Sequence, residues 1–160
     1  MVSAFNLYLF NRQGVCLHYA EWHRPKSVRH GAGSSDGDQR QMFSLVWALS
    51  DFASALNPRD PGRPPLGAPR KMGAGCGFHA CRTTTYKLHA LEAPSGLRLV
   101  LNTSPEAGDL RDVLLYVYEE LYVGTMLRNP AYIPGRPFTC DAFSAALSSY
   151  LRNRGLLRGV

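Results

Sequence analysis

The chain has 160 residues, of which 45% are apolar, and it carries a formal net charge of +6. This length suits one domain with one core, and no stretch approaches the roughly 20 apolar residues that a membrane-spanning helix needs. The charge permits an acidic partner or an anionic surface, but no aromatic-rich basic strand motif points to nucleic acid. We therefore expect a single domain over residues 1–160 and no nucleic-acid partner.

The chain begins with the pattern of a β-hairpin. Apolar and polar side chains alternate along residues 4–11 and again along 15–20, and the turn between these runs holds Asn11 and Gly14. Glycine adopts a positive φ without strain and asparagine can bond its own backbone, so both suit a tight turn. Asn6 and Arg12 interrupt the apolar run that a secretory signal would need. We expect a structured amino terminus and a cytoplasmic protein.

Two segments rich in glycine surround the first predicted helix. Residues 24–37 combine glycine, serine and basic side chains, and residues 59–77 interleave proline with glycine, so we expect flexible loops at both. Between them apolar side chains recur at helical spacing until Asn57 and Pro58 end the run, with Asp36 or Asp38 as the expected N-cap. The residues expected to face the core are Met42, Leu45, Val46, Leu49, Phe52, Ala53 and Leu56.

Three further strands and two helices complete the prediction. Strand composition occupies residues 78–84, 86–92 and 97–103, with a turn between the last two. Helices are expected from Asp109 to about Leu127 and from Thr139 or Asp141 to about Arg154. The order predicts an α+β fold in α/β/α layers, with a five-stranded antiparallel sheet, one helix on one face and two on the other.

Catalytic and metal-binding motifs are weak in this sequence. Cys76, His79 and Cys81 are zinc-type ligands, but they do not share one face and no nearby residue supplies a fourth ligand. No base is identifiable for a nucleophilic cysteine, and the glycine-rich residues 73–77 lack the ending of a phosphate-binding loop. We therefore expect a protein that is not an enzyme and has no catalytic residue, metal site or cofactor.

Some apolar side chains lie off the predicted core faces. Phe43 and Trp47 are neighbours at helical spacing, away from the stripe that holds Val46. Such side chains are typical of interface anchors, and an extra core layer is the alternative. The second predicted helix can face the sheet with Leu110, Val113, Val117 and Leu121. The predicted partner-binding residues are Phe43, Trp47, Leu115 and Tyr122.

The chain closely resembles the family of the smallest longin-like subunits of the TRAPP vesicle-tethering complex, the trafficking protein particle complex subunit 1 or Bet-five type. The likeness starts in the hairpin and extends almost to the end of the chain. Residues 30–37 and 59–75 look enlarged or altered relative to the family pattern. These departures affect the expected loop contacts and not the expected fold. The residues that carry the resemblance are 6–10, Arg12, Gly14, Cys16, Leu17, Tyr19, 21–23, 42–58, 86–89, Pro94, Gly96, 102–103, 111–114, 121–123, 129–130, 149–150 and Arg152.

This resemblance implies a longin, or SNARE-like, fold and a role in traffic from the endoplasmic reticulum to the Golgi. The chain would be a non-catalytic core subunit that helps form a platform of paired longin domains, and the assembled complex would promote guanine-nucleotide exchange on a Rab GTPase. The implied partners are other small TRAPP subunits, both longin-like and Bet-three-like, with the Rab GTPase and the membrane reached through the complex. The implied location is cytoplasmic and peripheral at the cis-Golgi and endoplasmic reticulum.

Other readings of the sequence remain as alternatives. An adaptor small chain or another longin-type trafficking subunit would share the fold. A longin SNARE would be expected to continue into a heptad helix and a membrane span. A small thiol or zinc enzyme would require a hyper-reactive cysteine or bound metal.

Overall fold

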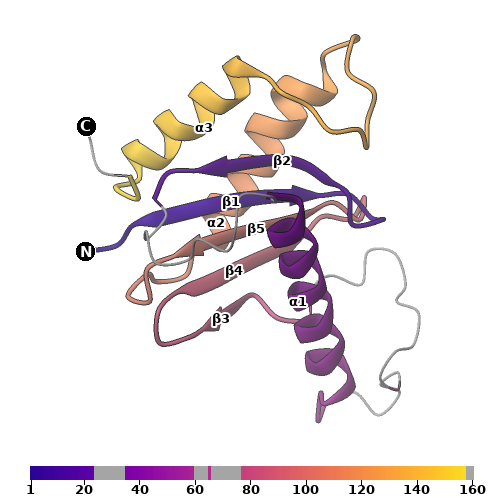
Figure 1. Ribbon diagram of the computed structural model, residues 1–160, viewed down its shortest axis with the longest axis vertical. Helices are drawn as coiled ribbons and strands as arrows, with labels where there is room; N and C mark the ends of the chain where they lie inside the picture. The colour runs from indigo at the N-terminus through magenta and orange to yellow at the C-terminus, as the bar shows by residue number, and fades with distance from the viewer. Residues whose placement is uncertain (24–34, 60–64, 66–76, 158–160) are drawn as a thin grey trace.

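An antiparallel five-stranded sheet lies at the centre of the protein (Figure 1). The computed structural model describes residues 1–23, 35–59, 65 and 77–157. The strands are β1 (Ala4–Phe10), β2 (Cys16–Glu21), β3 (Ala80–Arg82), β4 (Lys87–Glu92) and β5 (Arg98–Thr103), and their order in the sheet is β2-β1-β5-β4-β3. The predicted fold class and antiparallel sheet are confirmed.

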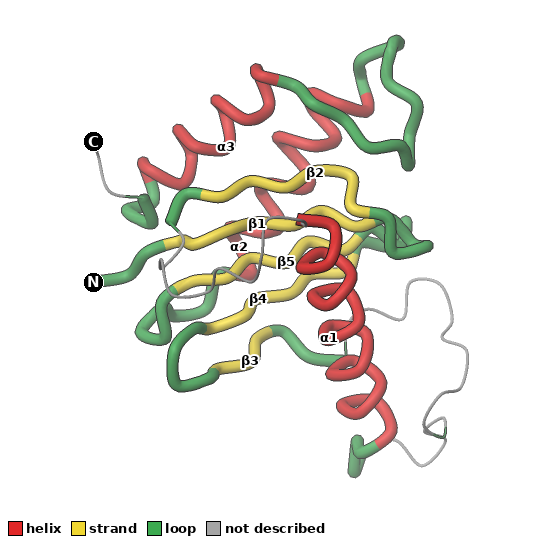
Figure 2. Tube along the Cα trace, in the orientation of Figure 1, coloured by secondary structure: helices red, strands yellow, loops and turns green. Residues whose placement is uncertain are grey.

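Helices cover the two faces of this sheet unequally. Helix α1 (Ser35–Ala55) packs on one face, and α2 (Arg111–Tyr116), η1 (Val117–Leu127) and α3 (Asp141–Asn153) pack on the other. Because β2 and β3 form opposite edges, the chain between them must cross the sheet, and Figure 2 shows α1 running across the strands. The helical segment α2–η1 and the helix α3 are the two helices predicted for the second face.

Side chains of β1 and β5 divide the core into two clusters. Leu7, Leu9 and Leu99 face the cluster formed with α2, η1 and α3, whereas Tyr8 and Phe10 face the cluster under α1. All of β5 is buried, which is expected of a central strand covered on both faces. The sheet therefore acts as the shared wall of both clusters.

The predicted hairpin turn is present with the expected chemistry. Gly14 has a φ of 87°, and a Cβ there would lie 2.8 Å from Cε1 of Phe43, so this position requires glycine on two grounds. The Asn11 side-chain oxygen accepts hydrogen bonds from the backbone N–H groups of Gln13 and Val15, at 3.0 and 2.9 Å. Backbone and side chain together hold the turn.

A β-bulge follows this turn in β2. Leu9 pairs with His18 and Phe10 pairs with Cys16, so Leu17 is the extra residue. The bulge places Leu17 and His18 on the α3 side of the sheet, where His18 lies 5.0 Å from the ring of Phe143. A backbone hydrogen bond of 2.9 Å from the N–H of Phe138 to the carbonyl of Leu17 covers this part of the sheet edge.

Several element boundaries differ from the prediction. Helix α1 begins at Ser35, so the expected loop over 24–37 is wrong for its last three residues, and residues 24–34 lie outside the described part of the chain, as does most of 59–77. Strand β3 is shorter than 78–84 because Thr83 begins a turn: its N–H donates to the carbonyl of Tyr86 at 2.8 Å.

The helix predicted from Asp109 to Leu127 changes its winding midway. Asp109 accepts a hydrogen bond of 3.1 Å from the N–H of Arg111, but the N-cap of α2 is the next residue, Leu110, so the expected cap is wrong by one position. From Val117 onward the segment is a π-helix, in which hydrogen bonds span five residues and not four. Its buried residues are Val117, Leu121, Tyr122 and Met126. Their spacing of four and five residues follows the wider winding.

Candidate interaction surfaces

Phe43 holds α1 against the β1–β2 hairpin. Its half-buried ring packs edge-on to Phe10 with ring centroids 5.4 Å apart, and it also contacts Gly14. The guanidinium of Arg98 lies 5.5 Å from the ring centroid and forms an ion pair of 3.4 Å with Glu92. Phe43 therefore belongs to the packing between helix and sheet, although the sequence separated it from the core face.

Trp47 lies one turn further along α1 and is 39% exposed. This exposure agrees with its predicted position off the core face. At 3.6 residues per turn, Trp47 is on the same side of the helix as Phe43. Phe43 packs against an aromatic ring of the sheet, whereas Trp47 has no aromatic ring contact among the described residues. Of the predicted pair, Trp47 alone offers an accessible aromatic surface.

The opposite flank of α1, together with Leu56 directly after its last residue, carries three exposed apolar side chains that the sequence placed in the core. Leu45, Phe52 and Leu56 are 38%, 52% and 67% exposed, and we call them the α1 stripe. Val46 instead is fully buried and contributes to the cluster under α1. The prediction that the stripe faces the sheet is wrong because the apolar arc of α1 is wider than the contact that one helix makes with a sheet.

The carboxyl-terminal half of α1 lies close to the chain that enters β3. The N–H of Gly77 donates a 3.0 Å hydrogen bond to the hydroxyl of Ser50, and a Cβ at Gly77 would lie 2.7 Å from the Ser50 carbonyl. Strand β3 is an edge strand, paired only with β4 among the described strands, and its Ala80 and Arg82 are exposed. Helix α1 runs toward this edge of the sheet (Figure 1).

On the other face of the molecule, Leu115 is accessible as predicted. It is 38% exposed, and the neighbouring Tyr116 is 40% exposed. The ring of Tyr116 stacks on Tyr150 of α3 with centroids 4.1 Å apart, and Arg154 is ion-paired with Asp112 close by. This surface joins α2 to α3, and it lies on the opposite side of the sheet from α1.

Tyr122 does not share this exposure, so the expectation that it points away from the core is wrong. It is 4% exposed and its ring packs 6.1 Å from Phe138, while its hydroxyl lies 3.4 Å from that of Tyr132. Burial raises the pKa of its phenol. The π-helical winding turns Tyr122 inward beside Leu121, which regular α-helical spacing does not predict.

The residues considered for zinc or thiol chemistry are not assembled into a site in the described part of the chain. No group of three His, Cys, Asp or Glu side chains suited to a metal occurs among the described residues, and Cys76 lies outside them. The His79 ring lies 3.3 Å from an Arg111 nitrogen. Burial raises the pKa of the Cys16 thiol to about 11, so this thiol is protonated at neutral pH.

The described helices contain no candidate for a membrane span, because none is both long and apolar enough to cross a bilayer.

The sheet, its unequal helical cover and the apolar helix surface together define a longin-like α+β domain. The sequence profile of the Sybindin-like family matches residues 4–154. Trafficking protein particle complex subunit 1 of Homo sapiens is 36% identical, and the match covers 95% of this chain and 94% of that protein. Transport protein particle subunit bet5 of Schizosaccharomyces pombe is 33% identical over 94% of this chain and 97% of its own length. Trafficking protein particle complex subunit 4 of Dictyostelium discoideum is 23% identical over 91% and 94%.

The chain belongs to the Sybindin-like family. The family resemblance seen in the sequence is thereby confirmed.

Proposed function

We propose that this chain is a non-catalytic core subunit of a TRAPP complex. The observation that carries the proposal is the end-to-end match to proteins named as subunit 1 of the trafficking protein particle complex. In this role the chain helps form the platform on which the assembled complex promotes nucleotide exchange on a Rab GTPase, in transport from the endoplasmic reticulum to the Golgi. It reaches the cytoplasmic surface of the cis-Golgi and endoplasmic reticulum through the complex.

The surface on α1 supports an assembly role. The α1 stripe leaves large apolar side chains in water, and such contiguous apolar surface is typical of an interface. The adjacent edge strand β3 has one side without a strand partner among the described residues. A second longin-like domain offers both an amphipathic helix and a sheet edge, so we assign the α1 stripe and β3 to a related subunit such as the one named subunit 4.

The accessible residues outside this surface complete the proposal. Trp47 lies on the other flank of α1, and Leu115 lies on the opposite face of the domain. Exposed tryptophan is a frequent interface anchor. We assign Trp47 to a neighbouring subunit or the GTPase, and Leu115 to a Bet-three-like subunit. Phe43 and Tyr122 pack inside the domain beneath these surfaces and contribute to them indirectly.

The test is co-expression of the chain with the other small TRAPP subunits of its source, followed by purification through a tag on this chain. We expect a stoichiometric complex that accelerates nucleotide release from a Rab GTPase only when this chain is present. Phe52→Asp should remove the related longin-like subunit, because an aspartate cannot be buried in an apolar contact without a partner. Trp47→Asp should reduce assembly or exchange.

The matched control is Gln41→Asp, an exposed substitution on the same helix that removes no apolar surface. A Phe43 variant is unsuitable because its ring packs on Phe10. Assembly and exchange at wild-type levels in both the Phe52→Asp and the Trp47→Asp variants would refute the assigned surface. A wild-type chain that purifies alone and leaves nucleotide release unchanged would refute the function.

A further inference from the structure

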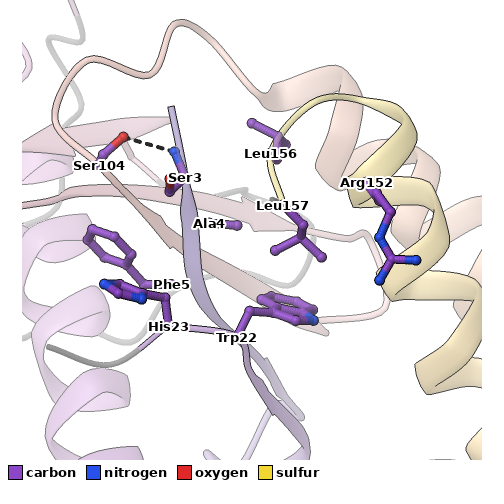
Figure 3. Close-up of a pocket in the computed structure, with 9 residues that line it drawn as sticks. All are labelled: Ser3, Ala4, Phe5, Trp22, His23, Ser104, Arg152, Leu156 and Leu157. Atoms are coloured by element: carbon purple, nitrogen blue, oxygen red, sulfur yellow. Dashed lines mark hydrogen bonds between the residues drawn. The ribbon is translucent and has the colours of Figure 1, made fainter. Parts of the chain in front are cut away.

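A pocket lies at the end of the domain where the first and last elements of the chain meet (Figure 3). Its volume is about 370 Å³, which is near the small end of the range of roughly 300–1,000 Å³ for ligand pockets. We call it the terminal pocket. It is lined by Ser3, Ala4, Phe5, Trp22, His23, Ser104, Arg152, Leu156 and Leu157. None of these residues belongs to α1 or to the surface around Leu115.

Hydrogen bonds between distant segments fix the walls of the terminal pocket. The N–H of Ala4 donates to the carbonyl of Leu156 at 2.7 Å, which ties the start of β1 to the chain after α3. The backbone groups of Trp22 and His23 donate to the carbonyl of Phe5 at 2.9 and 3.2 Å. These bonds all join backbone groups, so the walls of the pocket are held in place without a ligand.

Two further bonds set the side chains at opposite ends of the pocket. The indole N–H of Trp22 donates to the hydroxyl of Ser148 on α3 at 3.1 Å, which orients the ring. The Ser104 hydroxyl accepts the N–H of Ser3 at 3.0 Å and also bonds the carboxylate of Glu106, whose pKa is lowered by hydrogen bonds. An anion that does not itself line the pocket is therefore bonded to Ser104 at this end.

Arg152 gives the other end of the pocket a positive charge. In Figure 3 its side chain extends from α3 on the side where Leu157 and Trp22 lie, across the pocket from Ser104. The Arg152 guanidinium has no hydrogen-bond or ion-pair partner among the described residues, and no described acidic side chain lines the pocket. We call the apolar lining side chains Phe5, Trp22 and Leu157 the floor of the pocket. An uncompensated guanidinium at the same pocket fits a ligand with an apolar body and a carboxylate.

We propose that the terminal pocket binds the carboxyl-terminal residue of a partner protein, with an apolar last side chain on the floor and the terminal carboxylate at Arg152. A terminal residue carries both groups on one Cα, which suits a small pocket, whereas an internal acidic residue needs room for chain on both sides. Capture of a chain end is a recurring mode of peptide recognition. This inference does not depend on the proposed function.

Binding can be measured on the full chain with Trp22 as the reporter. The sequence contains two tryptophans, Trp22 and Trp47, so a Trp47→Phe background leaves only the one in the pocket. The probes are acetylated pentapeptides, Gly-Gly-Ser-Leu followed by Val, Leu or Phe, each with a free carboxylate or as the carboxyl-terminal amide. We expect at least one free-carboxylate peptide to give a saturable fluorescence change that weakens with added salt.

The amide of the same peptide should bind about tenfold more weakly, because it cannot form the charge-assisted pair with Arg152. Arg152→Gln should cause a similar loss for the free-carboxylate peptide, and Arg152→Lys should restore part of it. The control is Arg128→Gln, an exposed arginine remote from the pocket, which should leave the affinity unchanged.

Three results would overturn the proposal. They are saturable binding to none of the free-carboxylate peptides, equal affinity for the amide, and equal affinity in the Arg152→Gln variant. Decanoate serves as the lipid-like comparison: binding of decanoate without binding of any peptide would assign the pocket to a fatty acid and overturn the peptide proposal. Thermal unfolding of each variant confirms that the fold is retained, which we expect because Arg152 is exposed.

Discussion

Among the described residues, two histidines of the sheet are buried, and burial lowers the pKa of both. His89 of β4 is 1% exposed and its Nε2 lies 3.1 Å from the Thr103 hydroxyl. Burial, with a smaller contribution from nearby Lys87, lowers the pKa of His89 to about 4. His18 stacks on Phe138 with ring centroids 5.0 Å apart, and burial lowers its pKa as well. These imidazoles are core groups, which their isolated positions in the sequence do not reveal.

The depressed pKa of His89 predicts acid sensitivity. In the unfolded chain this histidine takes up a proton below about pH 6.5, whereas in the folded protein it does so only near pH 4. Its contribution to stability is therefore complete above pH 6.5 and is lost between these two values. His89→Gln removes this titration. From about pH 7 to pH 5, the wild type should lose about 2 kcal/mol more unfolding free energy than the variant.

Urea denaturation at a series of pH values measures this difference. The difference between the two slopes of unfolding free energy against pH removes the contributions of the carboxylates and His18, because these groups are present in both proteins. Parallel stability curves for the wild type and His89→Gln would show that His89 is protonated at the same pH in the folded and unfolded states, and the inferred cause would be wrong.

At the scale of elements, the winding of η1 decides which aromatic side chains are in the core. Leu110, Val113, Val117 and Leu121 are all buried, as the helical spacing predicts. Tyr122 is buried next to Leu121, which α-helical spacing does not predict. Sequence periodicity therefore identified one buried row along the whole segment, and it missed Tyr122, which the longer hydrogen-bond span of η1 places beside Leu121. Nothing in the local residue types marks that change.

The two predicted anchors on this segment should respond differently to truncation. Tyr122→Ala should lower the free energy of unfolding by about 3–5 kcal/mol, because it removes a buried aromatic ring and leaves a cavity. Leu115→Ala should change it by less than about 0.5 kcal/mol, since Leu115 is on the surface. Urea denaturation followed by circular dichroism gives both values. A small effect at Tyr122, or a large one at Leu115, would contradict the burial assigned here.

Helix α1 illustrates a different limit of sequence periodicity. Apolar residues occupy so much of its circumference that the pattern fits several orientations on the sheet. The structure selects the one in which Val46 is buried and Phe43 packs on Phe10, because the hairpin turn at Gly14 leaves room for that ring. The α1 stripe is then exposed as a consequence.

At the scale of the whole molecule, the sheet couples the two hydrophobic clusters of the core. The cluster under α1 and the cluster under α2, η1 and α3 share β1, β4 and β5, whose alternate side chains belong to each. Because the same strands carry side chains of both clusters, loss of their pairing would disrupt both, so we expect the two clusters to unfold together. On this basis we propose that the chain is one domain.

The two tryptophans test this cooperativity from opposite faces. Trp22 packs against the α3-side cluster and Trp47 lies on α1. In the single-tryptophan variants Trp22→Phe and Trp47→Phe, urea unfolding followed by fluorescence should give coincident transitions, each matching circular dichroism. Leu88→Ala in the α1 cluster and Leu147→Ala in the other should each shift the whole transition by about 2–5 kcal/mol. Separate transitions would divide the chain into two units.

The sequence alone determined the order of elements, the hairpin turn at Asn11 and Gly14, and the antiparallel sheet with its helical layers. These depend on local alternation, turn chemistry and caps, which are encoded by neighbouring residues. Together with the family resemblance they were sufficient for the fold and for an expectation of function. The exposure of Trp47 and Leu115 was also predicted, since each is an apolar residue out of phase with a core face.

Only the tertiary structure decided which apolar faces are covered and where the terminal pocket forms. Whether Phe43 or the α1 stripe is covered by the sheet depends on how α1 packs against the hairpin. The burial of Tyr122 depends on the π-helical winding of η1, which packs its ring near Phe138. The terminal pocket forms where a backbone hydrogen bond joins Ala4 to Leu156. Contacts between residues so far apart in the chain leave no periodic signal, because they depend on packing across elements and not on spacing within one.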